Sequence, residues 1–377
     1  MSAEELLARL VGFPTVSSES NLDLLAWVEG LVGPAAPGVR RFANPGGDKA
    51  NLLLSFGPDE PGGLVLSGHT DVVPVEGQAW RSDPFRLREA GGRLIGRGAC
   101  DMKGFLACCL ALVPEWGMLR RPVHLALSYD EEVGCTGVGP MAEWAGRLAP
   151  AVAVIGEPSR MQLVHAHKGG LIGWGHVTGR PGHSSQPDRA VNAVMAGAEC
   201  IVRFGEARAA LRAGRQDTAF DPPHSTVQVN LVEGGTGKNI VAEACDFFWE
   251  MRVLPGEDDR AVLAGIEARI GAEVVPAMQA VDRGCGVRLS VDARIPALAP
   301  NADGAAEARL LALLGQDAAM SVPYGSEAGI FQLAGVPSVI LGPGDIAQAH
   351  QPEEFVERSQ LAACVAVLRR VVGEFCG

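Results

Sequence analysis

The sequence lacks any apolar run long enough to cross a membrane. Its longest wholly apolar stretch includes residues 105–113 and ends at Pro114, whereas a transmembrane helix needs roughly 20 apolar residues. The first residues include Glu4 and Glu5 but no basic segment of the kind that begins a secretory signal. These absences predict a cytoplasmic protein with no membrane-spanning part.

The sequence is also poor in features of disulfide-bonded and nucleic-acid-binding proteins. Its nine cysteines are odd in number and include no C-x-x-C pair, which predicts reduced thiols rather than a disulfide framework or a thiolate zinc site. Asp and Glu total 44 against 32 Lys and Arg, so the net charge is −12 and repels nucleic acids and anionic membranes. We expect no nucleic-acid and no membrane partner, although a local basic pocket for a small carboxylate stays compatible with this charge.

What the sequence does contain is a repeated plan of apolar run followed by polar turn. Four runs, at residues 63–67, 124–129, 151–155 and 336–341, are each followed by acidic or histidine side chains. Runs of this kind are typical of central strands in a sheet covered by helices. Because sites in α/β sheets form beyond the carboxyl ends of the strands, we expect the polar residues after all four runs to converge.

The middle of the chain follows a different pattern. Between Cys245 and Val253, apolar residues alternate with mostly polar ones, as in a half-exposed antiparallel strand, and residues 191–208 have a helical pattern. We therefore predict an α/β protein whose mixed-sheet catalytic domain, residues 1–170 and 293–377, is flanked by helices. An α+β domain, residues 171–292, is inserted into it.

Taken singly, the histidine and carboxylates nearest the strand ends are ambiguous. His69 and Asp71 are the first and last residues of a triplet that suits either of two structures. One is a turn capped by Asp71, and the other is a metal ligand, His69, whose second ring nitrogen donates a hydrogen bond to the Asp71 carboxylate. Asp101 stands before an expected helix, where it can serve as an N-cap, as a carboxylate that bridges two cations, or as both.

The acidic turn at residues 130–132 is harder to explain without a cation, since three adjacent acids repel one another. Its alternative is a solvated turn; in the functional interpretation Glu132 binds a metal and Glu131 is the general base. Glu157 can be a loop acid and His350 a surface histidine. Together, the two histidines and three carboxylates form a ligand set suited to paired Zn²⁺, Co²⁺ or Mn²⁺.

At these residues the sequence resembles the dinuclear zinc aminoacylase/peptidase (M20) family, which includes acetylornithine deacetylases, desuccinylases and carboxypeptidases. The resemblance covers nearly the whole chain, and its motifs are residues 67–71 (SGHTD), 96–104 (GRGACDMKG), 130–134 (DEEVG), 156–158 (GEP) and 349–353 (AHQPE). It implies two divalent ions, Zn²⁺ or Co²⁺, with Asp101 shared between them. His69 and Glu157 would complete one site, Glu132 and His350 the other. Glu131 and Asp71 would be the catalytic residues.

The resemblance also makes the inserted domain a dimerisation (lid) domain and the protein a homodimer. It implies that His183, Asn239 and Arg252 hold the substrate, with Arg252 at its carboxylate; the plain alternatives are a core or surface histidine, a turn asparagine and a solvated arginine. Cys100 departs from the small or hydroxylated residue expected beside the bridging aspartate.

Several segments look most like the acetylornithine deacetylase branch of that family. The expected reaction is hydrolysis of Nα-acetyl-L-ornithine to L-ornithine and acetate, a step of arginine biosynthesis. Glu327 is a possible partner for the ornithine ammonium, or simply an acid at the start of a helix. The alternatives are a desuccinylase, a carboxypeptidase or dipeptidase of the same family, and a non-catalytic ligand-binding protein; the intact Glu131 argues against the last.

Overall fold

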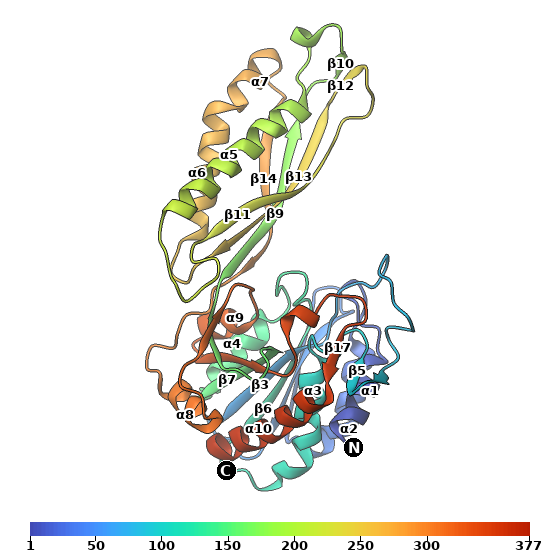
Figure 1. Cartoon of the computed structure of the whole chain (residues 1–377), viewed down its shortest axis with the longest axis vertical. Helices are drawn as coiled ribbons and strands as arrows, with labels where there is room; N and C mark the ends of the chain where they lie inside the picture. Colours follow the sequence, from blue (N-terminus) through green and yellow to red (C-terminus); the bar gives the residue numbers. More distant parts are fainter. The chain divides into compact units, whose positions relative to one another are not determined.

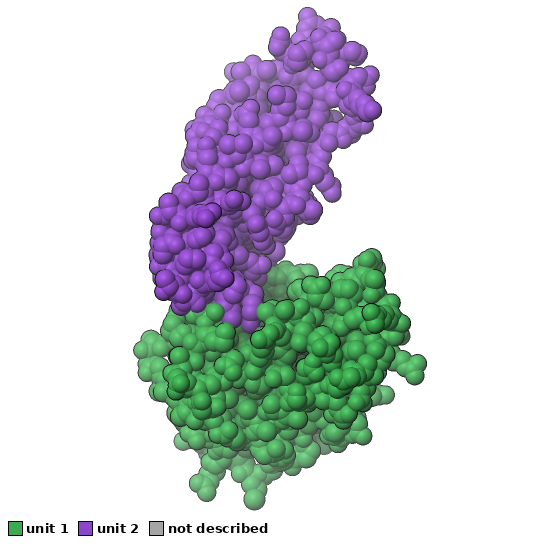
Figure 2. Space-filling model, viewed as in Figure 1, with its two compact units in different colours: residues 1–167, 298–321, 326–377 green, residues 168–297, 322–325 purple. Residues whose placement is uncertain are grey.

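The computed structural model describes residues 1–32 and 34–377 in full and divides into two compact units, which Figure 2 colours separately. The first unit contains residues 1–167, 298–321 and 326–377, and the second contains residues 168–297 and 322–325. The segment 171–292, predicted to be an insertion, lies inside the second unit. Residues 322–325 contact the start of β9 (Gly169–Thr178), where the Lys168 amide donates to the carbonyl of Val322 over 3.3 Å.

An eight-stranded mixed sheet forms the centre of the first unit, in the order β1-β2-β6-β3-β7-β16-β8-β15. The pairs β6–β3, β3–β7 and β7–β16 are parallel, whereas β1–β2, β2–β6 and β16–β8 are antiparallel. The strands are β1 (Gly38–Ala43), β2 (Ala50–Phe56), β3 (Leu64–His69), β6 (Val123–Ser128), β7 (Val152–Pro158), β8 (Val164–His167), β15 (Met320–Val322) and β16 (Ser338–Gly342). The prediction of a mixed α/β sheet is confirmed.

Helices cover both faces of this sheet because its central strands are apolar on both sides. Leu64, Leu66 and Val154 share one core with α3 (Lys103–Leu112), and α10 (Arg358–Cys376) packs beside α3 (Figure 1). Val65 and Ile155 alternate to the opposite face and are also buried. That face is covered by α4 (Gly139–Arg147) and α9 (Ala328–Leu333). The other first-unit elements are α1 (Ala3–Val11), α2 (Leu22–Val32), α8 (Ala305–Leu314) and the small sheet of β17 (Phe355–Glu357), β5 (Arg93–Ile95) and β4 (Arg88–Ala90).

The second unit is an antiparallel sheet with helices along one face (Figure 1). Its strand order is β11-β13-β9-β14, and the alternation predicted for residues 245–253 is confirmed, since Phe247 and Trp249 are buried and pack against Phe204 of α5. The elements are β9 (Gly169–Thr178), β10 (Gly182–His183), α5 (Ala193–Ala213), β11 (Thr226–Gly234), β12 (Ile240–Val241), β13 (Ala244–Val253), α6 (Asp259–Glu273), α7 (Val275–Val281) and β14 (Gly286–Ile295).

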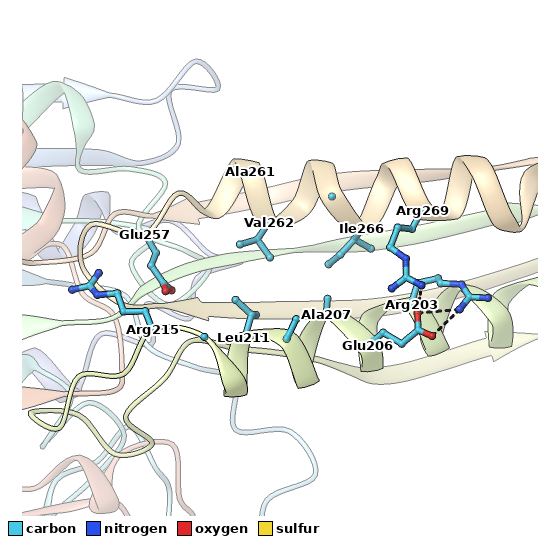
Figure 3. A pocket seen from close by; sticks show the side chains of 13 residues that line it. Arg203, Glu206, Ala207, Leu211, Arg215, Glu257, Ala261, Val262, Ile266 and Arg269 are labelled. Carbon is cyan, nitrogen blue, oxygen red and sulfur yellow. Dashed lines mark hydrogen bonds and ion pairs between the residues drawn. The ribbon is translucent and has the colours of Figure 1, made fainter.

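Helices α5 and α6 enclose a shallow groove of about 380 Å³ (Figure 3). Its floor includes Leu211, Val262 and Ile266. At one end Glu206 accepts from Arg203 at 2.9 Å and lies 2.7 Å from Arg269, so an ion-pair network joins the two helices. Among the described residues, those that line the groove include no histidine or cysteine.

All nine cysteines are free thiols and buried. Among the described residues, none of the helices combines the length and the apolar character needed to span a bilayer.

Candidate metal centre

The polar residues that follow the strands meet at one edge of the first unit's sheet. His69 ends β3, Glu157 lies near the end of β7, and the acidic turn at residues 130–132 follows β6, which are three neighbouring parallel strands. Ligand atoms of His69, Asp101 and Glu132 lie within 4.8 Å of one another, as do those of His69, Glu131 and Glu157. The convergence expected from the strand ends is therefore present, and His350 joins it from the loop after β16.

Asp101 directs its two carboxylate oxygens toward two different histidines. Its Oδ1 lies 3.0 Å from Nε2 of His69, and its Oδ2 lies 3.3 Å from Nε2 of His350. Nε2 of His350 is also 2.9 Å from Oε2 of Glu132. A carboxylate with one oxygen toward each histidine has the geometry needed to share two cations.

The orientation of His69 is set by a main-chain atom. Its Nδ1 lies 2.8 Å from the carbonyl oxygen of Asp71, whereas the Asp71 carboxylate, the partner expected from the sequence, is 3.7 Å away. A carbonyl only accepts, so in the neutral ring Nδ1 carries the proton and Nε2 presents its lone pair to the centre.

The Asp71 carboxylate holds the acidic turn instead. It accepts hydrogen bonds from the amides of Glu131 and Glu132, each at 3.2 Å, and from the Ser17 hydroxyl at 2.7 Å. Asp130, the first acid of the turn, pairs with Lys49 at 2.6 Å. These contacts separate the turn's three acids, so that only Glu131 and Glu132 join the centre.

Without cations, the burial of this group of acids costs free energy, because ionised carboxylates lose their contact with water. Burial and the charge of Asp101 raise the pKa of Glu132 to about 8 and that of Glu157 well above its usual range. Hydrogen bonds with Asp101 and Glu132 raise the pKa of His350 to about 10. Glu157 Oε1 also lacks a hydrogen-bond partner within the described residues. Buried carboxylates with unused oxygens, beside histidine nitrogens, fit divalent cations that accept N and O ligands.

Glu131 is placed where it can act as a base. Burial raises its pKa to about 7, despite the opposing charge of nearby His69. Its Oε1 accepts a hydrogen bond from the Cys135 thiol, with sulfur and oxygen 3.3 Å apart. Sequence reasoning did not single out Cys135, and the only available signal was its position four residues after Glu131.

The remaining first-unit candidates have buried positions. Glu327 precedes α9, is 1% exposed, and burial raises its pKa to about 7. Its carboxylate lies near the hydroxyls of Ser128 and Ser67, which lower that pKa. The Cys100 thiol donates to the carbonyl of Asp345 over 3.4 Å, so it points away from the ligand set.

All three residues predicted to hold substrate lie in the second unit. His183 on β10 pairs with Ile240, and the Ser184 amide donates to the carbonyl of Asn239 over 3.1 Å, so His183 and Asn239 are neighbours. Arg252 lies near the other end of β13, where it pairs with Gly170. At about 3.3 Å per residue, the length of β13 separates Arg252 from the other two by roughly 25 Å.

Comparison with known proteins agrees with this fold. A model of the peptidase family M20/M25/M40 matches residues 65–374. An acetylornithine deacetylase from Myxococcus xanthus is 35% identical over 98% of this chain and 97% of its own length. The M20 metallo-carboxypeptidase Sso-CP2 from Sulfolobus solfataricus has a TM-score of 0.74 at 17% identity, covering 99% of each chain. A dinuclear metal-binding M20 peptidase from Bacillus subtilis has a TM-score of 0.66 at 14% identity, covering 98% of this chain and 96% of its own.

Proposed function

Since this chain belongs to peptidase family M20/M25/M40 and is therefore a hydrolase, we propose that it removes the acetyl group from Nα-acetyl-L-ornithine with two divalent ions, Zn²⁺ or Co²⁺. The observation that carries the metal chemistry is Asp101, whose two oxygens are directed toward two different histidines. The choice of substrate is supported by near-full-length similarity to the acetylornithine deacetylase of Myxococcus xanthus.

In this proposal Asp101 would be shared by two ions, of which His69 and Glu157 would hold one and Glu132 and His350 would hold the other. When bound, the ions acidify a water molecule and polarise the substrate carbonyl. Glu131 takes the proton from the attacking water and delivers it to the departing amine, so that the acyl carbon gains an oxygen and the amide C–N bond breaks. A carboxyl with a pKa of about 7 suits both directions of transfer near neutral pH.

The second unit supports a role for a partner subunit. The α-carboxylate and the acetyl carbonyl of one acetyl-amino acid lie only a few bonds apart. His183, in contrast, pairs with Ile240 just before β13 begins, and Arg252 lies near the end of β13. This separation argues against one unit presenting both residues to one substrate. We infer that Arg252 binds the carboxylate with two parallel hydrogen bonds, and that His183 of the partner subunit reaches the carbonyl.

An exposed edge of the second unit suits such a dimer. Strand β11 is at the edge of its sheet and exposes Leu231 and Val232 by 54% and 53%. The adjacent helix α5 exposes Met195 and Val202 by 65% and 54%. An unpaired strand beside exposed apolar side chains is a surface that pairing with a second copy would cover.

Side-by-side kinetics test the substrate. We expect kcat/KM for Nα-acetyl-L-ornithine to exceed that for N-succinyl-diaminopimelate by at least about tenfold, or roughly 1.4 kcal/mol. A reversed preference would make the protein a desuccinylase with the same metal chemistry. Protein that hydrolyses no N-acyl amino acid or dipeptide with Zn²⁺ or Co²⁺ present would be a binding protein, and the proposal would be refuted.

Mixing two inactive variants tests the partner's histidine. His183→Ala and Glu131→Gln subunits are combined under conditions where subunit exchange is demonstrated by mass. If His183 acts on the partner's site, each mixed dimer has one site with both defects and one with neither, so activity partly returns. Continued inactivity of the proven mixed dimers would mean that His183 serves its own chain.

A further inference from the structure

The carboxylate of Glu354 joins two segments that carry metal-ligand candidates. Glu354 follows His350 by four residues, is 1% exposed, and accepts hydrogen bonds from main-chain amides that lead to Asp101. Its Oε1 accepts from the amides of Cys100 at 2.9 Å and Asp101 at 3.0 Å, and its Oε2 accepts from the amide of Gly98 at 3.1 Å. A single side chain thus holds three of the four amides between residues 98 and 101.

Arg97 completes this arrangement. Its Nη1 donates to Glu354 Oε2 at 2.7 Å, and the guanidinium is also 1% exposed. The same guanidinium reaches the carbonyl of Pro74 at 3.4 Å and the side chain of Gln78. The ion pair therefore neutralises the Glu354 charge and anchors a third segment, but only the Glu354 carboxylate contacts the amides of the Asp101 loop.

We propose that Glu354 is a positioning residue that fixes the Asp101 carboxylate relative to His350 before any ion binds. Rotation of the Asp101 main chain would turn one carboxylate oxygen away from its histidine. Since the Oε1 of Glu354 is committed to the amides of Cys100 and Asp101, that rotation would break both hydrogen bonds inside the protein, where amides find no water. The inference rests on the proposed metal centre and assigns Glu354 no contact with substrate.

The alternative is that Glu354 only balances the buried charge of Arg97. A single variant and a double variant together distinguish the positioning of Asp101 from charge balance for Arg97. Glu354→Met keeps an unbranched side chain of similar length but removes both acceptor oxygens, and it leaves Arg97 unpaired. Arg97→Met combined with Glu354→Met removes the unpaired charge while the amides of Gly98, Cys100 and Asp101 stay without the carboxylate acceptor. A positioning role therefore keeps the double variant defective, whereas charge balance alone would restore it.

The experiment measures Co²⁺ binding by chelator competition and by the visible absorption of bound Co²⁺, and needs no activity. We expect Glu354→Met and the double variant to weaken binding of the ion held by Asp101 and His350 by at least about tenfold, as for other residues that orient metal ligands, with an altered spectrum. The matched control is Asp259→Asn in the second unit, where buried Asp259 accepts from Arg294 at 2.7 and 3.0 Å; its Co²⁺ affinity should stay within about twofold. Wild-type affinity and spectrum in Glu354→Met, or their return in the double variant, would overturn the proposal.

Amide hydrogen exchange in the metal-free, unmutated protein tests the same idea without any variant that must fold. The amides of Cys100 and Asp101 should exchange far more slowly than that of exposed Gly77, because Glu354 already holds them. Exchange as fast as at Gly77 would refute preorganisation. A wild-type protein that binds no Co²⁺ would instead refute the proposed metal centre, and slow exchange would then show only that this loop is ordered without an ion.

Discussion

Removing the metal should make the stability of this protein fall as the pH rises. In the metal-free protein, burial raises the pKa of Glu132 from 4.5 to about 8. The unfolded chain loses this proton near pH 4.5, whereas the folded protein retains it until about pH 8. Stability from this group is therefore complete below pH 4.5 and is lost between pH 4.5 and pH 8. Glu131, with a pKa raised to about 7, contributes with the same sign.

The size of this pH-dependent loss of stability follows from the pKa shift of Glu132. At roughly 1.4 kcal/mol per pH unit, Glu132 loses up to about 4 kcal/mol between pH 5 and pH 8. Because the charge of Glu131 contributes to the raised pKa of Glu132, the losses from these two groups overlap and do not add in full. We therefore expect the measured difference from Glu132 to be between roughly 2 and 4 kcal/mol.

The assay is urea unfolding of chelator-treated protein at pH 5 and pH 8, beside a Glu132→Gln variant treated in the same way. The variant has no carboxyl to titrate at this position, and the other titrating groups are common to both proteins. Unmodified protein should lose roughly 2–4 kcal/mol more than the variant over this range, and Zn²⁺ should abolish its excess loss by keeping the carboxylates ionised when folded. Equal pH dependence of the two metal-free proteins would refute the reasoning.

Three further predictions concern single residues and the metals. Glu131→Gln should retain both ions by elemental analysis and lose at least about 100-fold in kcat; near-normal turnover would remove Glu131 as the base, and lost metal would make it a ligand. Chelation should abolish hydrolysis and Zn²⁺ or Co²⁺ should restore it, whereas full activity in protein shown to be metal-free would exclude the mechanism. Burial lowers the pKa of His124 to about 4, so its contribution to stability is present above pH 6.5 and falls by roughly 3 kcal/mol toward pH 4; His124→Gln should flatten that loss in acid unfolding.

Local sequence patterns predicted the elements in which each face has one constant environment, either core or solvent. Strand β13 alternates between a core and a half-exposed face, and this alternation is visible in its residues. The helix expected at residues 191–208 is α5, which begins at Ala193 and continues to Ala213. Its C-terminal end was predicted five residues too early, although residues 209–213 (AALRA) favour a helix and Gly214 is the stop signal.

The orientation of ligand candidates was beyond the reach of residue patterns. The prediction for His69 named the Asp71 carboxylate, yet the main-chain carbonyl of the same residue is its hydrogen-bond partner. Both the carboxylate and the main-chain carbonyl of Asp71 are compatible with its position two residues after His69. Only the path of the chain after β3, which commits the carboxylate to the amides of Glu131 and Glu132, decides between them.

By itself, the sequence determined the chemistry available to this protein: acids and histidines placed after apolar strands, which parallel pairing brings to one edge of a sheet. Only the tertiary structure decided which of these groups contact one another. It turned the two oxygens of Asp101 toward His69 and His350, and it placed Glu354 against amides about 254 residues away in the chain. Hydrogen bonds act over about 3 Å, and residues so distant in sequence come within that range only after the chain has folded.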